Sequence, residues 1–289
     1  MAERLGSEQD MKSLAAKFKT ALTSFTSSSS KFRILSTITP PADSNDTDAA
    51  VPQPNTLYVL DSSFNPPHRA HLQIALSALK HDGGSLPKRL LLLLAIQNAD
   101  KAPKPAAFEQ RLALMNAFAN DLISASSSNA PKPIIDIAVT KYPYFADKAA
   151  AIDEDGTYPG VEQVHCTGYD TLIRILNPKY YPPEHTLKPV APFLERHRLR
   201  VTYRASESDG GREEQDQYLE DLRSGKREHE GGKREWADKI TMIEEEGLDE
   251  ISSTNIRKAC KSGDAQSMQS MLTPRVQSCV TGEKLYLES

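Results

Sequence analysis

Two histidines follow a short apolar run in "LYVLDSSFNPPHRAH", residues 57–71. The run ends at Asp61, a turn with two serines and two prolines follows, and His68 and His71 open a segment with helical periodicity. At a spacing of three residues the two imidazoles share one face of the first helical turn. Because a helix start has unpaired N–H groups and a positive dipole end, this stretch predicts a compact site for anionic oxygens.

The loop before the histidines has the composition of a tight, fixed turn. Ser62 and Ser63 permit the turn, and Asn65 with the proline pair at 66–67 fixes the loop. A simpler alternative for the histidines remains open, in which one caps the helix and the other packs in the core. A metal pair is disfavoured, because no third ligand of matching type lies nearby.

A second group of polar residues lies in "EISSTNIRKAC", residues 250–260. Its three hydroxyl residues, at positions 252–254, stand at a predicted helix start, where free N–H groups favour an anion. Arg257 lies one turn further, on the face of Ser253, and its planar fork can grip two phosphate oxygens. The hydroxyls alone fit an ordinary helix cap, but together with the arginine and the histidine loop they predict a polyphosphate clamp.

A third motif, "TGYDTLIRI" at 167–175, follows a predicted strand that ends at Cys166. Gly168 allows the backbone to approach a ligand closely. Asp170 could cap the next helix, or bind a ribose hydroxyl or a metal-bound water.

The elements that must position these motifs alternate along the chain. The predicted strands are 57–60, 90–95, 134–139, 162–166, 198–203 and 239–243. The predicted helices are 69–80, 107–123, 145–152, 170–176, 253–261 and 264–272. Strand and helix in alternation predict an α/β fold, a Rossmann-like open parallel sheet with helices on both faces. Ligands of such sheets bind beyond the carboxyl ends of the strands, where all three motifs lie.

Two segments fall outside this pattern. Residues 1–55 are expected to form an N-terminal extension, an amphipathic helix followed by a Pro/Asp-rich linker. The helix would pack Leu14, Phe18, Leu22 and Phe25 on the domain formed by residues 56–289. Residues 205–235 are densely charged and punctuated by glycines, so we expect a disordered insertion or a solvated helix in its middle.

Composition excludes several classes of protein. A net charge of −4 gives no general attraction to nucleic acid or to an anionic membrane, so phosphate recognition must be local. The longest apolar run, 90–96, has the length of a strand and not of a membrane span. Three cysteines without ligand or disulfide spacing indicate a reducing compartment, and we expect a cytoplasmic or nuclear protein. No G-x-G-x-x-G follows a strand, which disfavours a dinucleotide-dependent dehydrogenase.

The sequence resembles a known family at these motifs. "SSFNPPHRAH" is similar to the [G/S]-x-F-[D/N]-P-x-H-x-G-H signature of the nucleotidyltransferase superfamily, and "ISSTNIR" to its I-S-S-T-x-x-R signature. Together with "GYDTL", they resemble the nicotinamide mononucleotide adenylyltransferases, in particular a divergent fungal-type branch. The likeness covers most of 57–275, including "FEQRLALM" at 108–115. Two positions depart from the signature, with Ser62 and Ala70 where glycine is common, and "TKYPYFADKAAAI" at 140–152 only loosely resembles the segment that recognises nicotinamide.

The resemblance implies a role for individual residues. His68 and His71 would contact ATP phosphates, and Arg257 would hold the β- and γ-phosphates. Further residues are implied to assist in substrate binding. They are Ser63 and Phe64 at the mononucleotide end of the cleft, Gly168 and Asp170 on the adenosine side, Ser253 and Thr254 at the β- and γ-phosphates, either Lys101 or Lys104 at a phosphate, and Ser62, Asn65 and Ser252 within the same two motifs.

The implied reaction is adenylyl transfer from ATP to nicotinamide mononucleotide, which gives NAD and pyrophosphate. Mg²⁺ would enter on the ATP phosphates, with no metal site made by protein residues. Two alternatives stay open: adenylyl or cytidylyl transfer to another phosphorylated acceptor, and a nucleotide-binding regulatory protein with weak ATPase activity. A homo-oligomer, or a protein partner bound through the 205–235 insertion, also stays open.

Overall fold

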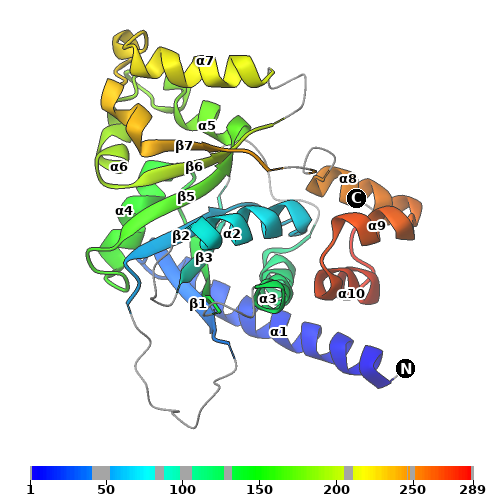
Figure 1. The fold of residues 1–289 in the computed structure, drawn as a ribbon. Coiled ribbons are helices and arrows are strands. Elements are labelled where there is room, and N and C mark those ends of the chain that lie inside the picture. Colours follow the sequence, from blue (N-terminus) through cyan, green and yellow to red (C-terminus); the bar gives the residue numbers. More distant parts are fainter. Residues whose placement is uncertain are drawn as a thin grey trace.

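A seven-stranded sheet forms the centre of the molecule, with helices on both faces (Figure 1). The computed structural model describes residues 2–40, 53–81, 88–97, 106–126, 132–204, 211–245, 247 and 251–287. The strands are β1 (Phe32–Ile38), β2 (Thr56–Asp61), β3 (Arg89–Ala95), β4 (Ile134–Thr140), β5 (Glu162–Gly168), β6 (Arg198–Thr202) and β7 (Ile240–Ile243). Their order is β1-β4-β3-β2-β5-β6-β7.

The pairing of the strands confirms the predicted Rossmann-like sheet. The strands β2 to β7 run parallel, and only the edge strand β1, among those described, pairs antiparallel, with β4. From β2 the chain proceeds to β3 and β4 on one side, and from β5 to β6 and β7 on the other. The carboxyl ends of β2 and β5 therefore border the switch point, where ligands of open α/β sheets bind.

The helices cover both faces of this sheet. They are α1 (Ala2–Ser27), α2 (Arg69–His81), α3 (Phe108–Ala125), α4 (Phe145–Asp155), α5 (Tyr169–Ile175), α6 (Ala191–Arg196), α7 (Arg212–Arg223), α8 (Ser253–Ser262), α9 (Ala265–Met271) and α10 (Pro274–Gly282). The six predicted strands and six predicted helices are confirmed. The sequence pattern does not predict β1, α6 or α10.

The leucine run of β3 shows how one strand serves two cores. Successive side chains of a strand point to opposite faces. Accordingly Leu90 and Leu92 join a cluster with α1, α2 and α3, whereas Leu91 and Leu93 join a cluster with Ile152 of α4. All five side chains are fully buried. A continuous apolar run is what a strand covered on both faces requires.

The N-terminal segment is part of the same core. Phe18, Leu22 and Phe25 of α1 are buried in the cluster that contains α3, as the helix periodicity predicts. The next segment forms β1, whose Arg33 pairs with Val139 of β4. The expected extension thus contributes a strand as well as a helix, and residues 41–52 of the expected linker lie outside the described residues.

Of the two expectations for the charged segment 205–235, disorder or a solvated helix in its middle, the described residues agree with the helix. Residues 205–210 lie outside the described part, but α7 and two short 3₁₀ helices, Glu228–Glu230 and Arg234–Lys239, follow. Leu222 and Trp236 are 1% exposed and pack in a cluster with α5 and α6. Arg227 donates a hydrogen bond of 2.7 Å to the carbonyl oxygen of Leu176. A few well-placed apolar residues and one guanidinium therefore fix a segment whose composition is almost entirely polar.

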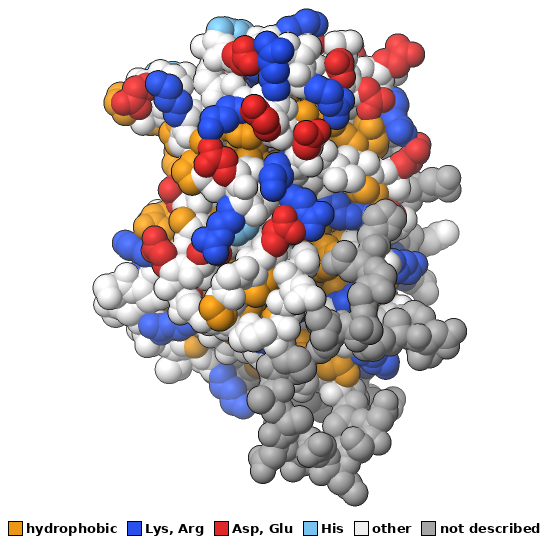
Figure 2. Space-filling view, turned by 60° about the vertical axis from the view of Figure 1, so that its left-hand side comes forward, with side chains coloured by type: hydrophobic (Ala, Val, Ile, Leu, Met, Phe, Trp, Pro, Cys, Tyr) orange, Lys and Arg blue, Asp and Glu red, His pale blue; other side chains and the backbone are white. Residues whose placement is uncertain are grey.

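The surface is mixed in charge. Figure 2 shows one face, on which the Lys and Arg side chains alternate with Asp and Glu side chains over the described residues. Such interspersion agrees with the small net charge of −4. No described helix has the length and apolar character that a membrane span requires.

Candidate active site

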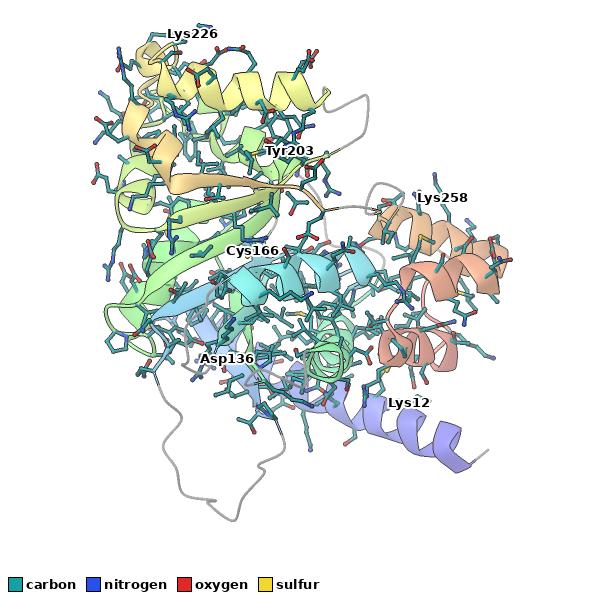
Figure 3. The ribbon with its side chains drawn as sticks, viewed as in Figure 1. Lys12, Asp136, Cys166, Tyr203, Lys226 and Lys258 are labelled. Atoms are coloured by element: carbon teal, nitrogen blue, oxygen red, sulfur yellow. The ribbon has the colours of Figure 1, made fainter. Side chains whose placement is uncertain are left out.

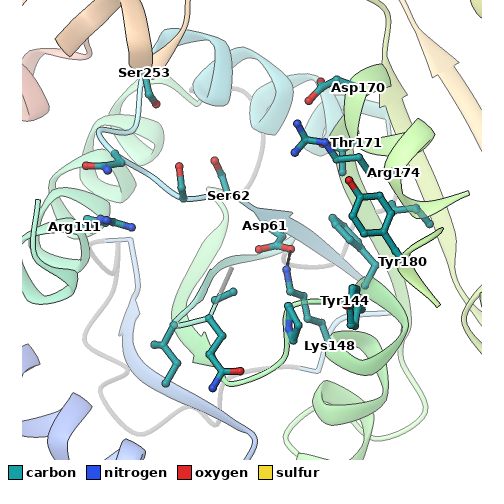
Figure 4. Close-up of a pocket in the computed structure, with 18 of the residues that line it drawn as sticks. Asp61, Ser62, Arg111, Tyr144, Lys148, Asp170, Thr171, Arg174, Tyr180 and Ser253 are labelled. Carbon is teal, nitrogen blue, oxygen red and sulfur yellow. Dashed lines mark hydrogen bonds and ion pairs between the residues drawn. The ribbon is translucent and has the colours of Figure 1, made fainter. Parts of the chain in front are cut away.

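A cavity of about 440 Å³ lies at the carboxyl ends of the central strands. Its walls come from the loop after β2, the segments after β3 and β4, and the first turns of α3, α4, α5 and α8. Figure 4 shows Ser253 and Arg111 on one side and Asp170, Arg174 and Tyr180 on the other. The sheet topology therefore places the cavity where the histidine loop and the other two motifs converge.

The loop after β2 turns sharply at Phe64. Its φ of 43° lies in the left-handed region, which is unusual for an aromatic residue. The side chain is fully buried, with its ring centroid 5.2 Å from that of His71 and 6.4 Å from that of Phe118. Phe64 is not among the residues that line the cavity. It supports His71 from behind, which differs from the predicted contact with the mononucleotide.

His68 and His71 form a stacked pair at the start of α2. Their ring centroids are 3.7 Å apart, with an angle of 27° between the planes. The Nδ1 atom of His71 accepts a hydrogen bond of 3.2 Å from the His68 N–H, and Nε2 lies 2.9 Å from Ser62 Oγ. A neutral His71 therefore carries its proton on Nε2 and donates it to Ser62, which lines the cavity.

Both imidazoles are neutral at pH 7. Burial, together with the smaller effect of the positive charge of Arg204, lowers the pKa of His71 to about 3. Burial also holds the pKa of His68 well below its usual range, with contributions from His71 and Arg204. Neither ring is among the residues that line the cavity, so the pair lies behind Ser62, which does line it. An anion close to the rings would favour their protonation.

The helix α8 closes onto the histidine loop. Ser253 Oγ donates a hydrogen bond of 3.0 Å to the carbonyl of Pro66, and Arg257 Nη1 donates one of 2.9 Å to the carbonyl of Asn65. Arg257 Nη2 lies 3.2 Å from Thr254 Oγ1. Ser253, Thr254, Arg257 and Asn65 all line the cavity. The two signature motifs are thus brought together.

Ser252 has a different position from the other two hydroxyl residues. Its side chain accepts a hydrogen bond of 3.1 Å from the Asn255 N–H, so it caps α8. It is not among the residues that line the cavity. The ordinary cap role is therefore correct for Ser252, whereas Ser253 and Thr254 face the cavity.

Gly168 leaves room for two charged side chains, which a larger residue would displace. A Cβ atom at this position would lie 2.7 Å from Asp170 Oδ1 and 2.9 Å from Arg204 Nε. Asp170 does not cap α5: the N-cap residue of this helix is Gly168, and no side chain makes a capping hydrogen bond there. Instead Asp170 Oδ1 lies 3.3 Å from Arg204 Nε in an ion pair at the edge of the cavity.

An ion pair lies in the floor of the cavity. Lys148 of α4 contacts Asp61 at the end of β2, and both side chains are 6% exposed (Figure 4). The ammonium group of Lys148 also lies 4.9 Å from the ring centroid of Phe145. Tyr144, Phe145 and Tyr180 provide aromatic walls at this end. One end of the cavity is therefore aromatic with a neutralised charge pair, whereas the other end is polar and cationic.

Three cationic residues at or near the cavity are not predicted as site residues from the sequence, and they differ in how they could be found. Arg111 occurs in "FEQRLALM" and Lys148 in the 140–152 segment, so both lie in stretches that resemble the family. Arg204 has no such signal, because it lies between the predicted strand 198–203 and the densely charged segment 205–235. Lys101 and Lys104, predicted to bind phosphate, lie outside the described residues.

The described residues offer no metal site of their own. Within the described ranges no group of three or more His, Cys, Asp or Glu residues could hold a metal ion. The acidic residues that line the cavity there are Asp61 and Asp170, and each is ion-paired. These residues fit a cation that arrives with phosphate ligands better than one held by protein carboxylates.

No protein-family model matches the chain. Among solved structures, two of nicotinic acid mononucleotide adenylyltransferase from Plasmodium falciparum share the fold. The complex with NaAD has a TM-score of 0.51 at 16% identity, and the complex with APC has 0.53 at 15%. Each match covers 80% of this chain and 97% of the other. The fold is that of a Rossmann-like nucleotidyltransferase.

The sequence comparison identifies the family. The chain is 35% identical over 223 residues to a Schizosaccharomyces pombe protein named "Putative nicotinamide mononucleotide adenylyltransferase", covering 76% of this chain and 82% of that protein. The chain therefore belongs to the nicotinamide mononucleotide adenylyltransferase family.

Proposed function

We propose that the protein transfers an adenylyl group from ATP to nicotinamide mononucleotide, with NAD and pyrophosphate as products. The observation that carries the proposal is the contact of Ser253 and Arg257 with the loop after β2. It brings Ser253, Thr254 and Arg257 to the same cavity as Ser62, with the histidine pair directly behind Ser62, in a chain that belongs to this family.

The polar end suits a triphosphate. His68 and His71 stand at the start of α2, and Arg257, Ser253 and Thr254 stand at the start of α8, so two positive helix ends meet there. In the proposed complex these groups donate to phosphate oxygens. Either Lys101 or Lys104 would add a further cation.

The reaction needs alignment and charge neutralisation, with no covalent intermediate. An oxygen of the mononucleotide 5′-phosphate attacks the α-phosphorus of ATP, and the bond from that phosphorus to the oxygen that bridges the α- and β-phosphates breaks. Pyrophosphate leaves with the electron pair. The nucleophile is already an anion at neutral pH, so no general base is needed. The residues of this chain hold both reactants in line and stabilise the charge that develops on the phosphates.

Magnesium is part of this proposal as an ion bound to the ATP phosphates. Mg²⁺ takes phosphate oxygens and waters readily and few protein carboxylates, which agrees with the ion-paired state of Asp61 and Asp170. When bound, the ion would neutralise phosphate charge and help to orient the leaving pyrophosphate.

The aromatic end suits the pyridine ring of the acceptor. The ring of nicotinamide mononucleotide is cationic, and tyrosine faces such as those of Tyr144 and Tyr180 attract a cation. Because Asp61 neutralises Lys148, this end has no net charge from the pair, which favours an uncharged amide. The observation that favours the rival acceptor, nicotinic acid mononucleotide, is Arg174, which also lines the cavity and could pair with a carboxylate.

The test is incubation of the protein with ATP, Mg²⁺ and one acceptor at a time, with detection of dinucleotide and pyrophosphate. NAD from nicotinamide mononucleotide supports the proposal, and the R257A variant should abolish most of the product. Product only from nicotinic acid mononucleotide would favour the rival acceptor. Product from phosphopantetheine alone, or ATP hydrolysis with no acceptor used, would overturn the proposal in favour of another transferase or a regulatory protein.

A further inference from the structure

Gln215 of α7 holds the backbone of Arg204 from both sides. Its Oε1 atom accepts a hydrogen bond of 3.1 Å from the Arg204 N–H, and its Nε2 atom donates one of 2.5 Å to the Arg204 carbonyl. Gln215 is fully buried, although the rest of α7 is rich in charge. A primary amide both donates and accepts, so one side chain satisfies both backbone groups of a single residue.

This contact occurs where the chain leaves the sheet. β6 ends at Thr202, and the Tyr203 N–H still donates to the Ile243 carbonyl at 3.0 Å. At Arg204 the side-chain amide of Gln215 makes the two backbone hydrogen bonds that a neighbouring strand would otherwise make. Tyr203 lies below α7 (Figure 3), and the guanidinium of Arg212 lies 3.9 Å from its ring centroid. The first turns of α7 are therefore fixed to the end of β6.

Arg204 in turn contacts the wall of the candidate active site through Asp170, without lining the cavity itself. Its Nε atom lies 3.3 Å from Asp170 Oδ1, and Asp170 lines the cavity. The guanidinium packs against Gly168, where a Cβ atom would come within 3.0 Å of it. Its charge also reaches His68 and His71. Arg204 therefore contributes a cation between the adenosine motif and the histidine pair.

We propose that Gln215 is a positioning residue, and that α7 serves to hold Arg204 against Asp170 on the ATP side of the cavity. The inference rests on the proposed adenylyl transfer. It gives the charged segment a role inside the enzyme: the segment contributes one buried amide that fixes the direction of a cation in the nucleotide site.

The experiment compares Q215A with a matched control, Q217A. Gln217 is the same residue type two positions along α7, is exposed, and donates a hydrogen bond of 2.7 Å to Asp221. Both variants are measured for ATP affinity in Mg²⁺ by titration calorimetry, and for kcat and KM. We expect Q215A to weaken ATP binding and lower kcat/KM on the order of tenfold, since a displaced positioning group can cost up to about 10²-fold. Q217A should match the wild type.

A double-mutant cycle separates positioning from general packing. If Gln215 acts through Arg204, Q215A will have no further effect on ATP affinity in the R204A background. Additive losses, or a Q215A variant with wild-type affinity and kinetics, would overturn the inference. Because Q215A opens a gap in a buried site, Q215E is a second variant: it keeps the size and the acceptor but loses the donor to the Arg204 carbonyl, and it should also weaken ATP binding.

The ATP titration keeps this inference separate from the proposed function. Coupled loss of ATP affinity in Q215A and R204A, in a protein that makes no dinucleotide, would support the positioning role and defeat the adenylyl transfer. Normal NAD synthesis by Q215A would defeat the positioning role alone.

Discussion

Ser253 Oγ donates a hydrogen bond of 3.0 Å to the carbonyl oxygen of Pro66, a residue 187 positions earlier in the chain. Arg257 reaches the neighbouring carbonyl of Asn65 at 2.9 Å. The site is therefore assembled by docking the start of α8 on the loop after β2. Either motif alone would be one helix start, and the docking makes them two walls of one cavity.

Replacing Arg257 should separate its two roles. Arg257→Ala removes a cation and the bond to the Asn65 carbonyl, so we expect kcat to fall on the order of 10²–10³-fold, as for other donors to transition-state charge. Arg257→Lys keeps the charge but not the planar guanidinium, so its kcat should lie between that of the wild type and that of Arg257→Ala. Steady-state release of pyrophosphate is the measurement. The exposed Lys258→Ala is the matched control, and equal loss in both alanine variants would contradict a specific role for Arg257.

His71→Ala should impair turnover without unfolding the protein. The ring contacts Ser62 Oγ at 2.9 Å and stacks on His68, so its removal takes away a donor beside the cavity. We expect a loss of kcat on the order of 10²-fold. Circular dichroism should remain native, and the exposed His229→Ala should have wild-type kinetics. A His71→Ala variant with near-normal kcat would remove His71 from the catalytic assignment.

The sequence predicts the parallel part of the fold because each of those strands is an apolar run between helical segments. The edge strand β1 is missed because its residues are mostly half-buried and its partner, β4, is about 100 residues away. Its identity depends on a tertiary contact that no local pattern records.

In the candidate site too, some residues are predicted by local sequence patterns and others are recognised only from their tertiary contacts. The histidine pair and the α8 hydroxyls are predicted from their spacing after strands and at helix starts. Lys148 and Arg204 are not, because only their pairing with Asp61 and Asp170 distinguishes them from surface cations. Phe64 shows the converse: its place in the motif suggests a contact with substrate, but its left-handed backbone turns the ring into the core.

Buried histidines should make the protein less stable as the pH falls. Burial lowers the pKa of His68, His71, His165 and His197, and that of His71 falls to about 3. Below about pH 6.5 the unfolded chain binds protons that the folded chain does not, so the free energy of unfolding decreases with falling pH. Each such histidine contributes a slope of up to about 1.4 kcal/mol per pH unit.

This dependence is checked by urea unfolding at pH 7.5, 6.5 and 5.5. Stability should be level above about pH 7.5 and fall between pH 6.5 and 5.5, a range in which exposed carboxylates are ionised in both states. His71→Ala should reduce the slope, whereas His229→Ala should leave it unchanged. An unfolding free energy that rises toward pH 5.5 would show that the histidines are not held neutral.

Phe25→Ala tests whether the N-terminal helix belongs to the core. Phe25 is fully buried against the cluster that includes α3, so its truncation should lower the free energy of unfolding by about 3–5 kcal/mol. The exposed Thr23→Ala on the same helix should change it by less than about 0.5 kcal/mol. Urea unfolding measures both. Equal stability of the two variants would indicate a separate, dispensable extension.

Asp61→Asn tests how the cavity distinguishes an amide from a carboxylate on the acceptor ring. In the wild type Asp61 neutralises Lys148 beside the aromatic walls, so a carboxylate gains nothing from the lysine. The substitution keeps the size of the side chain but leaves the ammonium charge uncompensated. We expect the ratio of kcat/KM for nicotinamide mononucleotide over nicotinic acid mononucleotide to fall by roughly tenfold, equivalent to about 1.4 kcal/mol.

The ratio of the two kcat/KM values is measured on one preparation, so it does not depend on the fraction of folded protein. This matters because loss of one partner of a buried ion pair is destabilising. The exposed Glu154→Gln on α4, the helix that carries Lys148, removes one negative charge away from the cavity and should leave the ratio unchanged. If Asp61→Asn remains active and its ratio equals that of Glu154→Gln, the charge pair does not govern the choice of acceptor.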